Sequence, residues 1–324
     1  MVTYVKSAVI CHGDCDGVIS SFLYIKHYLR DVYPNNVSMV FTQPWRAHVD
    51  LRKIPKESRE VVMLDIALNN DVVNCLLSMA GPNMKIVVID HHASSEAFID
   101  KLSRAGVKII WNKSTSTPRL IREVLRTSIN PFEEFLVKVA DVCEGVEAPD
   151  EEVMKVADLI KLSIARDPSD TEFMNYLIKS MLAGHKIQML DEVVKRASIA
   201  KWLLNKLLRQ LTSRSVVVGN YLITTLSASE SRIYAGLLGV ASTELARETR
   251  SDIILVREEE GKVVITVRSN KREALTICRL VAEKLNGKYG GHPEAASATL
   301  SNKSLVEVQQ AILEVIKSVR RSIT

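Results

Sequence analysis

The sequence has no long apolar segment and no regular cysteine pattern. No run approaches about 18 uninterrupted apolar residues, the length that a membrane-spanning helix needs, and Met1–Lys6 lacks an apolar signal region. Five cysteines stand at irregular spacings without a Cys-x-x-Cys pair, which argues against a disulfide framework and a structural zinc site. We also find no internal repeat. These absences predict a cytoplasmic protein, in a reducing compartment, without a membrane span.

Composition limits the fold more than the function. The 324 residues, 47% hydrophobic and 25% charged, suffice for two domains with separate cores. The net charge of +5 suits an anionic partner, but many solvated surfaces carry a similar excess of basic side chains. Charge alone therefore does not decide the function.

Acidic and histidine side chains follow three short apolar runs. Runs of β-branched and aliphatic residues are typical of buried parallel strands, whose carboxyl ends meet at the edge of an α/β sheet where ligands bind. The residues after the three runs are His12-Gly13-Asp14-Cys15-Asp16-Gly17, then Asp65, then Asp90-His91-His92. We expect these side chains to lie close together at one edge of a sheet.

A fourth acid, Asp141, ends the apolar segment 135–140. One acid at the end of an element is often a helix cap, but several converging carboxylates repel each other unless cations neutralise them. Carboxylates with neutral imidazoles suit hard or borderline divalent ions, so the pattern predicts a divalent metal centre. Cys11, Cys15 and Cys143 flank these residues and are either thiolate ligands or small apolar filler, of which we favour the filler.

Hydrophobic periodicity predicts an α/β fold in which strands and helices first alternate, as in a parallel sheet. The expected strands are 7–11, 38–41, 60–65, 85–90 and 107–111, with helices at 18–30, 70–79 and 95–105. A helical part follows at 118–127, 131–142, 150–164 and 169–183, and one long helix at 186–211. Two hairpins at 215–225 and 252–268, with helices at 230–248, 271–286 and 303–320, indicate a smaller mixed-sheet α/β domain.

This pattern predicts three parts: a catalytic domain at 1–185, a linker helix at 186–213 and a substrate-binding domain at 214–324. The loop after the second strand contains Trp45 and Arg46, which either stack a nucleotide base or cover the sheet edge.

The ordered motifs resemble the four motifs of the DHH phosphoesterase superfamily. This superfamily includes RecJ-type exonucleases, nanoRNases, phosphatases of 3',5'-bisphosphate nucleosides and family II pyrophosphatases. A fifth stretch, Gly-Gly-His-Pro-Glu-Ala-Ala at 290–296, is similar to the glycine-histidine motif of the C-terminal domain that many members carry. The motifs span nearly the whole chain in the family's order, and the segment 139–142 looks more like the RecJ-type fourth motif than the nanoRNase one.

The resemblance implies two Mn²⁺ ions, with Mg²⁺ or Co²⁺ as alternatives. Carried over by motif, the ligands are His12 and Asp14 for one ion, Asp16, His91 and Asp141 for the other, and Asp65 as a bridge. Asp90 would orient an imidazole, and His92 would contact the scissile phosphate or assist the leaving group. His12 stands two residues before Asp14, whereas pyrophosphatases of the family place their histidine four before it.

The resemblance also implies a phosphate-binding surface in the C-terminal domain, formed by Arg268, Ser269, Gly290, Gly291 and His292. A guanidinium binds phosphate in a bidentate manner, and a glycine pair exposes backbone N–H groups to an anion, although a plain turn is the alternative for the glycines. Tyr289 and Ser297 stand where the family pattern has glycines, which would narrow the pocket.

We therefore expect a Mn²⁺-dependent phosphodiesterase that hydrolyses nucleotide phosphodiester bonds, as an exonuclease on single-stranded DNA or RNA or on short oligonucleotides. The alternatives are a phosphatase of 3',5'-bisphosphate nucleosides, a cyclic-dinucleotide phosphodiesterase and a non-enzymatic binding module of a replication complex. All the ligand positions are present, which favours the enzyme. The expected partner is the nucleic acid or oligonucleotide substrate; the oligomeric state is not predicted.

Overall fold

The computed structural model describes residues 6–125, 128–147 and 150–321. The chain divides into two compact units, one ending at Ser198 and the other beginning at Ile199. This boundary lies inside the long helix α9 (Asp191–Arg214), which a short 3-10 turn, η4 (Ile187–Met189), precedes. The limits expected at 185 and 213 for the two domains stay predictions.

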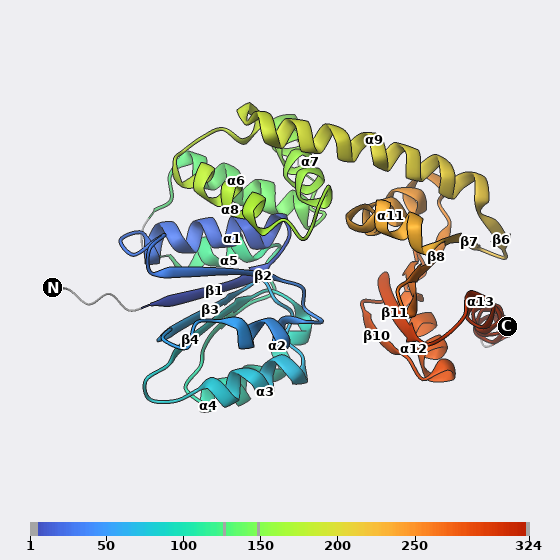
Figure 1. Cartoon of the computed structure of the whole chain (residues 1–324), viewed down its shortest axis with the longest axis horizontal. Helices are drawn as coiled ribbons and strands as arrows, with labels where there is room; N and C mark the ends of the chain where they lie inside the picture. Colours follow the sequence, from blue (N-terminus) through green and yellow to red (C-terminus); the bar gives the residue numbers. More distant parts are fainter. Residues whose placement is uncertain (1–5, 126–127, 148–149, 322–324) are drawn as a thin grey trace. The chain divides into compact units, whose positions relative to one another are not determined.

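A parallel five-stranded sheet forms the centre of the first unit (Figure 1). Its order is β2-β1-β3-β4-β5, and every neighbouring pair is parallel. The strands are β1 (Ser7–His12), β2 (Val37–Thr42), β3 (Glu60–Leu64), β4 (Lys85–Asp90) and β5 (Lys108–Trp111). They match the five predicted strands, because continuous apolar runs are what a sheet covered on both faces requires.

Alternate residues of each strand face two separate hydrophobic cores. Val9 and Val62 pack with the helices on one face, whereas Ile10 and Val61 pack with those on the other. The first group of helices is α1 (Cys15–Tyr24) with the π-helical turn η1 (Ile25–Leu29), α5 (Thr117–Val124), α6 (Pro131–Cys143), α7 (Glu151–Ala165) and α8 (Thr171–Leu182). The second group is α2 (Ala47–Asp50) with η2 (Leu51–Lys53), α3 (Asn70–Met79) and α4 (Ile99–Arg104), which follows the 3-10 turn η3 (Ala93–Phe98). Residues 126–127 of the helix expected at 118–127 lie outside the described residues.

The turn between β1 and α1 is tight because Gly17 has no side chain. A Cβ atom at Gly17 would lie 2.1 Å from the carbonyl oxygen of His12. Asp14 caps α1, accepting a hydrogen bond from the Gly17 N–H at 3.0 Å. The helix therefore starts directly beside the strand end, and the side chains of the loop are held at the sheet edge.

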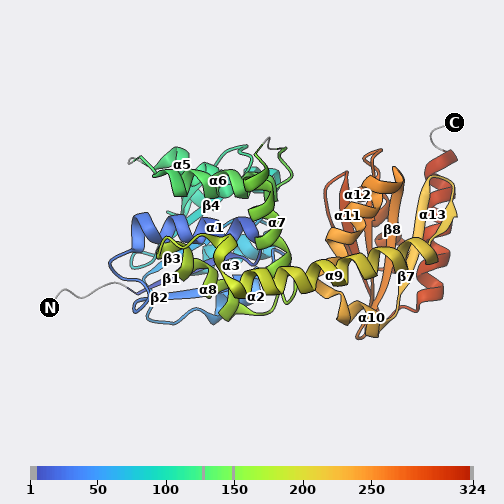
Figure 2. The same ribbon diagram turned by 90° about the horizontal axis from the view of Figure 1, so that it is seen from above.

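The second unit contains a mixed six-stranded sheet in the order β10-β11-β9-β8-β7-β6. Its strands are β6 (Val216–Val218), β7 (Tyr221–Leu226), β8 (Asp252–Glu259), β9 (Lys262–Arg268), β10 (Lys288–Gly291) and β11 (Ala295–Ser301). The helices are α10 (Ala228–Ile233), the 3-10 turn η5 (Ala235–Leu237), α11 (Leu238–Thr249), α12 (Ala274–Leu285) and α13 (Leu305–Arg321). In Figure 2, α13 lies along the sheet, against which it packs together with α12.

The predicted α/β fold class, with a parallel sheet and a second mixed sheet, is confirmed. Both predicted hairpins form antiparallel pairs, but the helix expected at 230–248 is interrupted by η5. The β10–β11 hairpin was missed because its strands consist mainly of glycine, alanine and serine rather than β-branched residues. None of the helices in the described ranges is long and apolar enough to cross a membrane.

Candidate metal centre

Two groups of metal-ligating side chains share Asp65. One group is His12, Asp14 and Asp65, and the other is Asp65, His91 and His92. In each group the ligand atoms lie within 4.8 Å of one another. His12 is the last residue of β1, and the other residues follow the carboxyl ends of β1, β3 and β4, at the edge where the sequence pattern predicts them.

Asp65 is buried and has a left-handed backbone, with φ of 58°. Few residues other than glycine adopt this conformation, although aspartate and asparagine tolerate it best. The Asp65 N–H donates to the carbonyl oxygen of Ile89 at 3.0 Å, which fixes the residue against the end of β4. Strained conformations of this kind concentrate at functional sites because surrounding contacts must hold them.

The ring of His91 presents an unsatisfied nitrogen to the cluster. Its Nδ1 lies 3.2 Å from the carbonyl oxygen of Ser114, which can only accept, so Nδ1 carries the proton and donates. Its Nε2 is buried, lies 3.5 Å from Oδ1 of Asp65 and forms no hydrogen bond with the residues that the structure describes. A buried nitrogen without a hydrogen bond fits a metal ion. Histidine ligands are commonly oriented by a hydrogen bond from the other ring nitrogen, as Nδ1 makes here.

His12 is oriented in the same manner by Gln43. The Nε2 of His12 lies 3.0 Å from Oε1 of Gln43, while its Nδ1 lies 2.9 Å from Oδ2 of Asp14. The amide oxygen accepts, so Nε2 donates and Nδ1 faces the carboxylates. Gln43 belongs to the loop after β2 that was predicted at this edge, but nothing in the sequence pattern assigned it to His12.

Asp90, which belongs to neither group, pairs with His92 of the cluster. Asp90 is fully buried, and its Oδ1 lies 2.7 Å from Nδ1 of His92. Its other oxygen accepts from the Ser95 hydroxyl and the N–H of His92. The indole N–H of Trp111 donates to the carbonyl oxygen of His92 at 2.8 Å. Asp90 therefore fixes the orientation of the His92 ring, which is the geometry expected for an aspartate that orients an imidazole.

Charges in the cluster shift the pKa values of its members strongly. Burial by itself would lower the pKa of His91, but Asp65 outweighs it and raises the pKa to about 9. Burial would also lower the pKa of His12. The carboxylates of Asp14 and Asp65 outweigh this effect and raise the pKa well above its ordinary value. Burial and the carboxylates of Asp65 and Glu144 raise the pKa of Asp16. These shifts mark a cluster of strongly interacting charges, which is typical of functional sites.

Glu144, which the sequence analysis did not single out, lies close enough to interact with the cluster. Reduced hydration and the carboxylates of Asp14 and Asp65 raise the pKa of Glu144 to about 7. It follows Asp141 by three positions at the end of α6. The only signal for Glu144 in the sequence was its position close to Asp141.

Asp16 and Asp141 are held by a hydroxyl-rich loop and stand outside the two groups of three. The backbone N–H of Thr117 and the hydroxyl of Ser20 each donate to Asp16 at 3.0 Å. Asp141 accepts from the hydroxyls of Thr115 and Ser116 and from the guanidinium of Arg119, and Thr117 also donates to Asp65 at 3.1 Å. The segment 114–117 therefore contacts four predicted ligands, since the Ser114 carbonyl also accepts from His91. The sequence analysis did not assign this role to the segment. The assignment of Asp16 and Asp141 as metal ligands stays a prediction.

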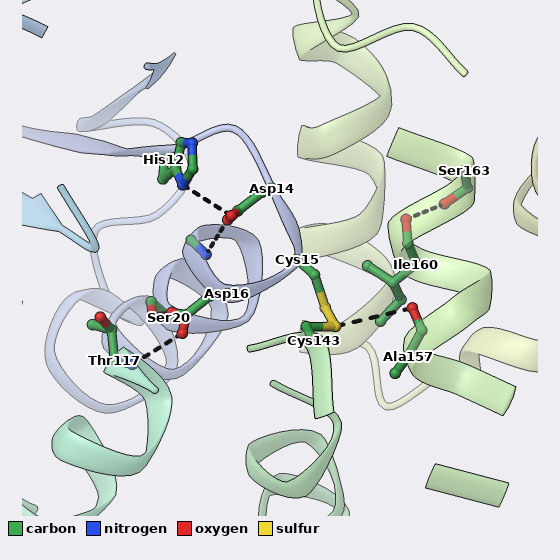
Figure 3. The surroundings of a disulfide bond; sticks show 11 residues. His12, Asp14, Cys15, Asp16, Ser20, Thr117, Cys143, Ala157, Ile160 and Ser163 are labelled. Carbon is green, nitrogen blue, oxygen red and sulfur yellow. Dashed lines mark hydrogen bonds and ion pairs between the residues drawn. A yellow bond between two sulfur atoms is a disulfide. The ribbon is translucent and has the colours of Figure 1, made fainter. Parts of the chain in front are cut away.

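A disulfide joins Cys15 to Cys143, contrary to the expectation drawn from cysteine spacing (Figure 3). The bond ties the start of α1, between Asp14 and Asp16, to the last turn of α6. The two cysteines are 128 positions apart, so only the folded chain brings them together. The interpretation of these two residues as apolar filler is wrong, and cysteine usage no longer supports a reducing compartment.

The predicted phosphate-binding residues meet at one corner of the second unit. Arg268 pairs with Ala295 across β9 and β11, and the Ser269 N–H donates to the carbonyl oxygen of Glu294 in the turn that follows His292. Arg268 is half-buried, and its Nε donates to the hydroxyl of Thr243 at 3.0 Å. Burial lowers its pKa. The His292 side chain is exposed.

Gly290 and Gly291 lie in the edge strand β10 rather than in a turn, opposite Ser297 and Ala296. The φ of Gly291 is 132°, and a Cβ atom there would lie 2.5 Å from the carbonyl oxygen of Ala295. Only glycine fits this position. Ser269 is buried, and its hydroxyl oxygen accepts hydrogen bonds from the backbone N–H groups of Lys271 and Glu273. These bonds stabilise the turn before α12.

Comparison with known proteins agrees with this architecture. Residues 219–321 match the family model of the DHHA1 domain. The chain is similar to RecJ from Thermus thermophilus in complex with Mn²⁺, with a TM-score of 0.66 and 17% identity over 95% of this chain and 51% of that one. The chain therefore shares the fold of RecJ, and its C-terminal part matches the DHHA1 domain.

Two further proteins with this fold are similar along nearly their whole length. The pGpG-specific phosphodiesterase PggH from Vibrio cholerae has a TM-score of 0.64 and 16% identity, covering 97% of this chain and 99% of that one. An exopolyphosphatase-related protein from Bacteroides fragilis has a TM-score of 0.55 and 18% identity, covering 96% and 91%. The chain spans about half the length of the Thermus RecJ chain. The comparison with curated protein sequences found no match.

Proposed function

We propose that this chain is a metal-dependent phosphodiesterase that hydrolyses nucleotide phosphodiester bonds, as an exonuclease on single-stranded DNA or RNA or on short oligonucleotides. The observation that carries the proposal is the shared position of Asp65 in two groups of carboxylates and imidazoles. The unsatisfied Nε2 of His91 adds to it, because a buried nitrogen without a hydrogen bond is costly unless a ligand uses it. RecJ with Mn²⁺ and a pGpG-specific phosphodiesterase, both similar in fold, support the same chemistry.

The residues present fit divalent ions of the Mn²⁺ type, with Mg²⁺ or Co²⁺ as alternatives. His12 and Asp14 would hold one ion, His91 with Asp16 and Asp141 the other, and Asp65 would serve both. Such a pair of ions, when bound, lowers the pKa of a water molecule and neutralises charge on the transferring phosphate.

The side chains around the metal ligands have positioning roles. Asp90 holds Nδ1 of His92 and leaves Nε2 as the ring nitrogen that would contact the scissile phosphate or give a proton to the leaving oxygen. Gln43 and the carbonyl of Ser114 fix the rings of His12 and His91, so that these side chains need little rearrangement when a cation binds.

The second unit would bind a phosphate of the substrate next to the one being cut. Arg268 supplies a guanidinium, and His292 supplies an exposed ring on the turn beside it. In this division of labour the first unit would carry the chemistry, and α9 would serve as the tether between the two units.

Short substrates are the second candidate within this class. The chain covers 99% of PggH, a pGpG-specific phosphodiesterase, but only 51% of the Thermus RecJ chain. The likeness over nearly the whole length of a pGpG-specific phosphodiesterase supports substrates of a few nucleotides.

A time course on labelled oligonucleotides tests the proposal. The substrates range from two to about twenty nucleotides, as DNA and as RNA, labelled at either end, with Mn²⁺ or with a chelator. We expect metal-dependent release of mononucleotides from one end, fastest on the shortest chains if the second candidate is correct. Intact substrates of every length with Mn²⁺ present would contradict the proposed activity.

A further inference from the structure

Asp141 is the one predicted metal ligand whose carboxylate is already saturated by donors. Its Oδ1 accepts from the Thr115 hydroxyl at 2.6 Å and from the Ser116 hydroxyl at 2.7 Å. Its Oδ2 accepts from Arg119 twice, from Nε at 2.8 Å and from Nη2. An ionised carboxylate offers about four lone-pair positions, so these four donors leave none for a cation.

Asp65 differs from Asp141 in this respect. Its only hydroxyl donor among the described residues is Thr117, at 3.1 Å from Oδ1, and its carboxylate also faces the rings of His12 at 3.6 Å and His91 at 3.5 Å. The two carboxylates are both buried, yet one faces ligand atoms and the other faces a guanidinium. The candidate metal centre is therefore asymmetric. The carboxylate of Asp65 is accessible to a cation, whereas that of Asp141 is occupied by the guanidinium of Arg119.

We propose that Arg119 is an intramolecular competitor of the divalent cation at Asp141. A bidentate guanidinium and a metal ion require the same oxygen atoms and neutralise the same charge, so one must leave for the other to bind. Arg119 thereby sets the affinity for the ion that would use Asp141, whereas the ion assigned to His12 and Asp14 does not compete with it. This inference rests on the proposed function, because it presupposes that the cluster binds divalent ions.

Arg122 offers a matched control one turn further along the same helix. Its Nε donates to Oε2 of Glu134 at 3.0 Å, so it also joins α5 to α6 by a guanidinium–carboxylate pair. Glu134, however, is not part of the cluster. Comparison of Arg119→Gln with Arg122→Gln therefore separates the loss of charge at Asp141 from the loss of a link between the two helices.

The test is calorimetric titration of Mn²⁺ into the metal-free full chain and into each variant. For Arg119→Gln we expect the weaker of two binding events to tighten by at least about tenfold, the effect of removing one strong charge-assisted pair, with the tighter event unchanged. Arg122→Gln should bind as the wild type does. Arg119→Lys keeps the charge without the bidentate geometry and should give an intermediate affinity, which also keeps the test valid if Arg119→Gln does not fold.

Three results have distinct meanings. Equal Mn²⁺ affinities in Arg119→Gln and Arg122→Gln would overturn the inference. Weaker binding in Arg119→Gln would also overturn it, because Arg119 would then position Asp141 for the metal ion. Absence of Mn²⁺ binding in the wild type and in all variants would instead contradict the proposed function. The unfolding temperature gives a second measurement: Mn²⁺ should raise it more in Arg119→Gln than in the control.

Discussion

At the scale of single residues, Asp65 shows how the site is held before any ligand binds. Its φ of 58° costs backbone energy, and its buried carboxylate lies among other acids. Neither feature helps folding, so the surrounding contacts, including the Thr117 hydroxyl at 3.1 Å, must hold the residue in place. Such local conflict is expected where a residue serves function rather than stability.

This view predicts different effects of two substitutions at Asp65. Asparagine tolerates the left-handed conformation and keeps an oxygen for Thr117, so Asp65→Asn should change the metal-free stability by less than about 1 kcal/mol. Alanine lacks this tolerance, and Asp65→Ala should lose about 1 to 2 kcal/mol. Urea unfolding in the presence of a chelator measures both. Equal losses in the two variants would show that the carboxylate, not the backbone, decides stability here.

At the scale of secondary-structure elements, the disulfide joins the two helices that present Asp14, Asp16 and Asp141. The start of α1 and the end of α6 are both helix termini, where backbone groups lack intrahelical partners and the chain frays most easily. A covalent link there restricts both motions at once. It also restricts the unfolded chain, because it closes a loop of 128 residues.

Reduction of the Cys15–Cys143 bond should therefore destabilise the first unit. The chain-entropy model gives about 4 to 5 kcal/mol for a loop of this length, and we expect the unfolding temperature to fall by roughly 10 °C with a dithiol reductant. Thiol labelling of the denatured, unreduced chain is the sharper measurement: only Cys11, Cys75 and Cys278 should react. Five labelled thiols would show that the bond does not exist, and the Cys143→Ser variant, which should not respond to reductant, is the control for stability.

The elements also show what the sequence could and could not predict. Apolar runs that end in Asp65 and Asp90 predicted both the parallel sheet and the edge where the side chains gather, because strand burial and strand direction are local properties of the pattern. The contact of Arg119 with Asp141 and the Cys15–Cys143 bond depend on how α5, α6 and α1 pack. Packing between elements distant in sequence leaves no local periodic signal, so these features required the structure.

At the scale of the whole molecule, the metal cluster and the predicted phosphate-binding corner belong to different units. The first contains His12, Asp65 and His91, and the second contains Arg268 and His292. On the proposed function, this division would separate the chemistry from part of the substrate binding, so that the two should respond independently to substitutions.

Substitutions in the second unit should therefore lower activity without removing metal. His292→Ala and Arg268→Ala should each reduce kcat/KM on oligonucleotides by roughly ten- to a hundred-fold, the value of one charged contact to phosphate, and leave Mn²⁺ binding unchanged. A small artificial diester without a second phosphate should be affected much less. The control is Arg272→Ala, which removes an exposed arginine paired with Glu294 on the same turn. Equal losses on both substrates, or loss of Mn²⁺ in His292→Ala, would refute this division of labour.

The most direct test of the central claim is the rate at which the chelator-treated protein hydrolyses a generic phosphodiester when Mn²⁺ is added. The wild type should be inactive without metal and active with it. The rate of Asp65→Asn should be lower by a factor of about a hundred or more, with the fold intact, because Asp65 belongs to both groups of ligands. A rate in Asp65→Asn close to that of the wild type, or hydrolysis by the wild type that persists in excess chelator, would contradict the metal-centre account.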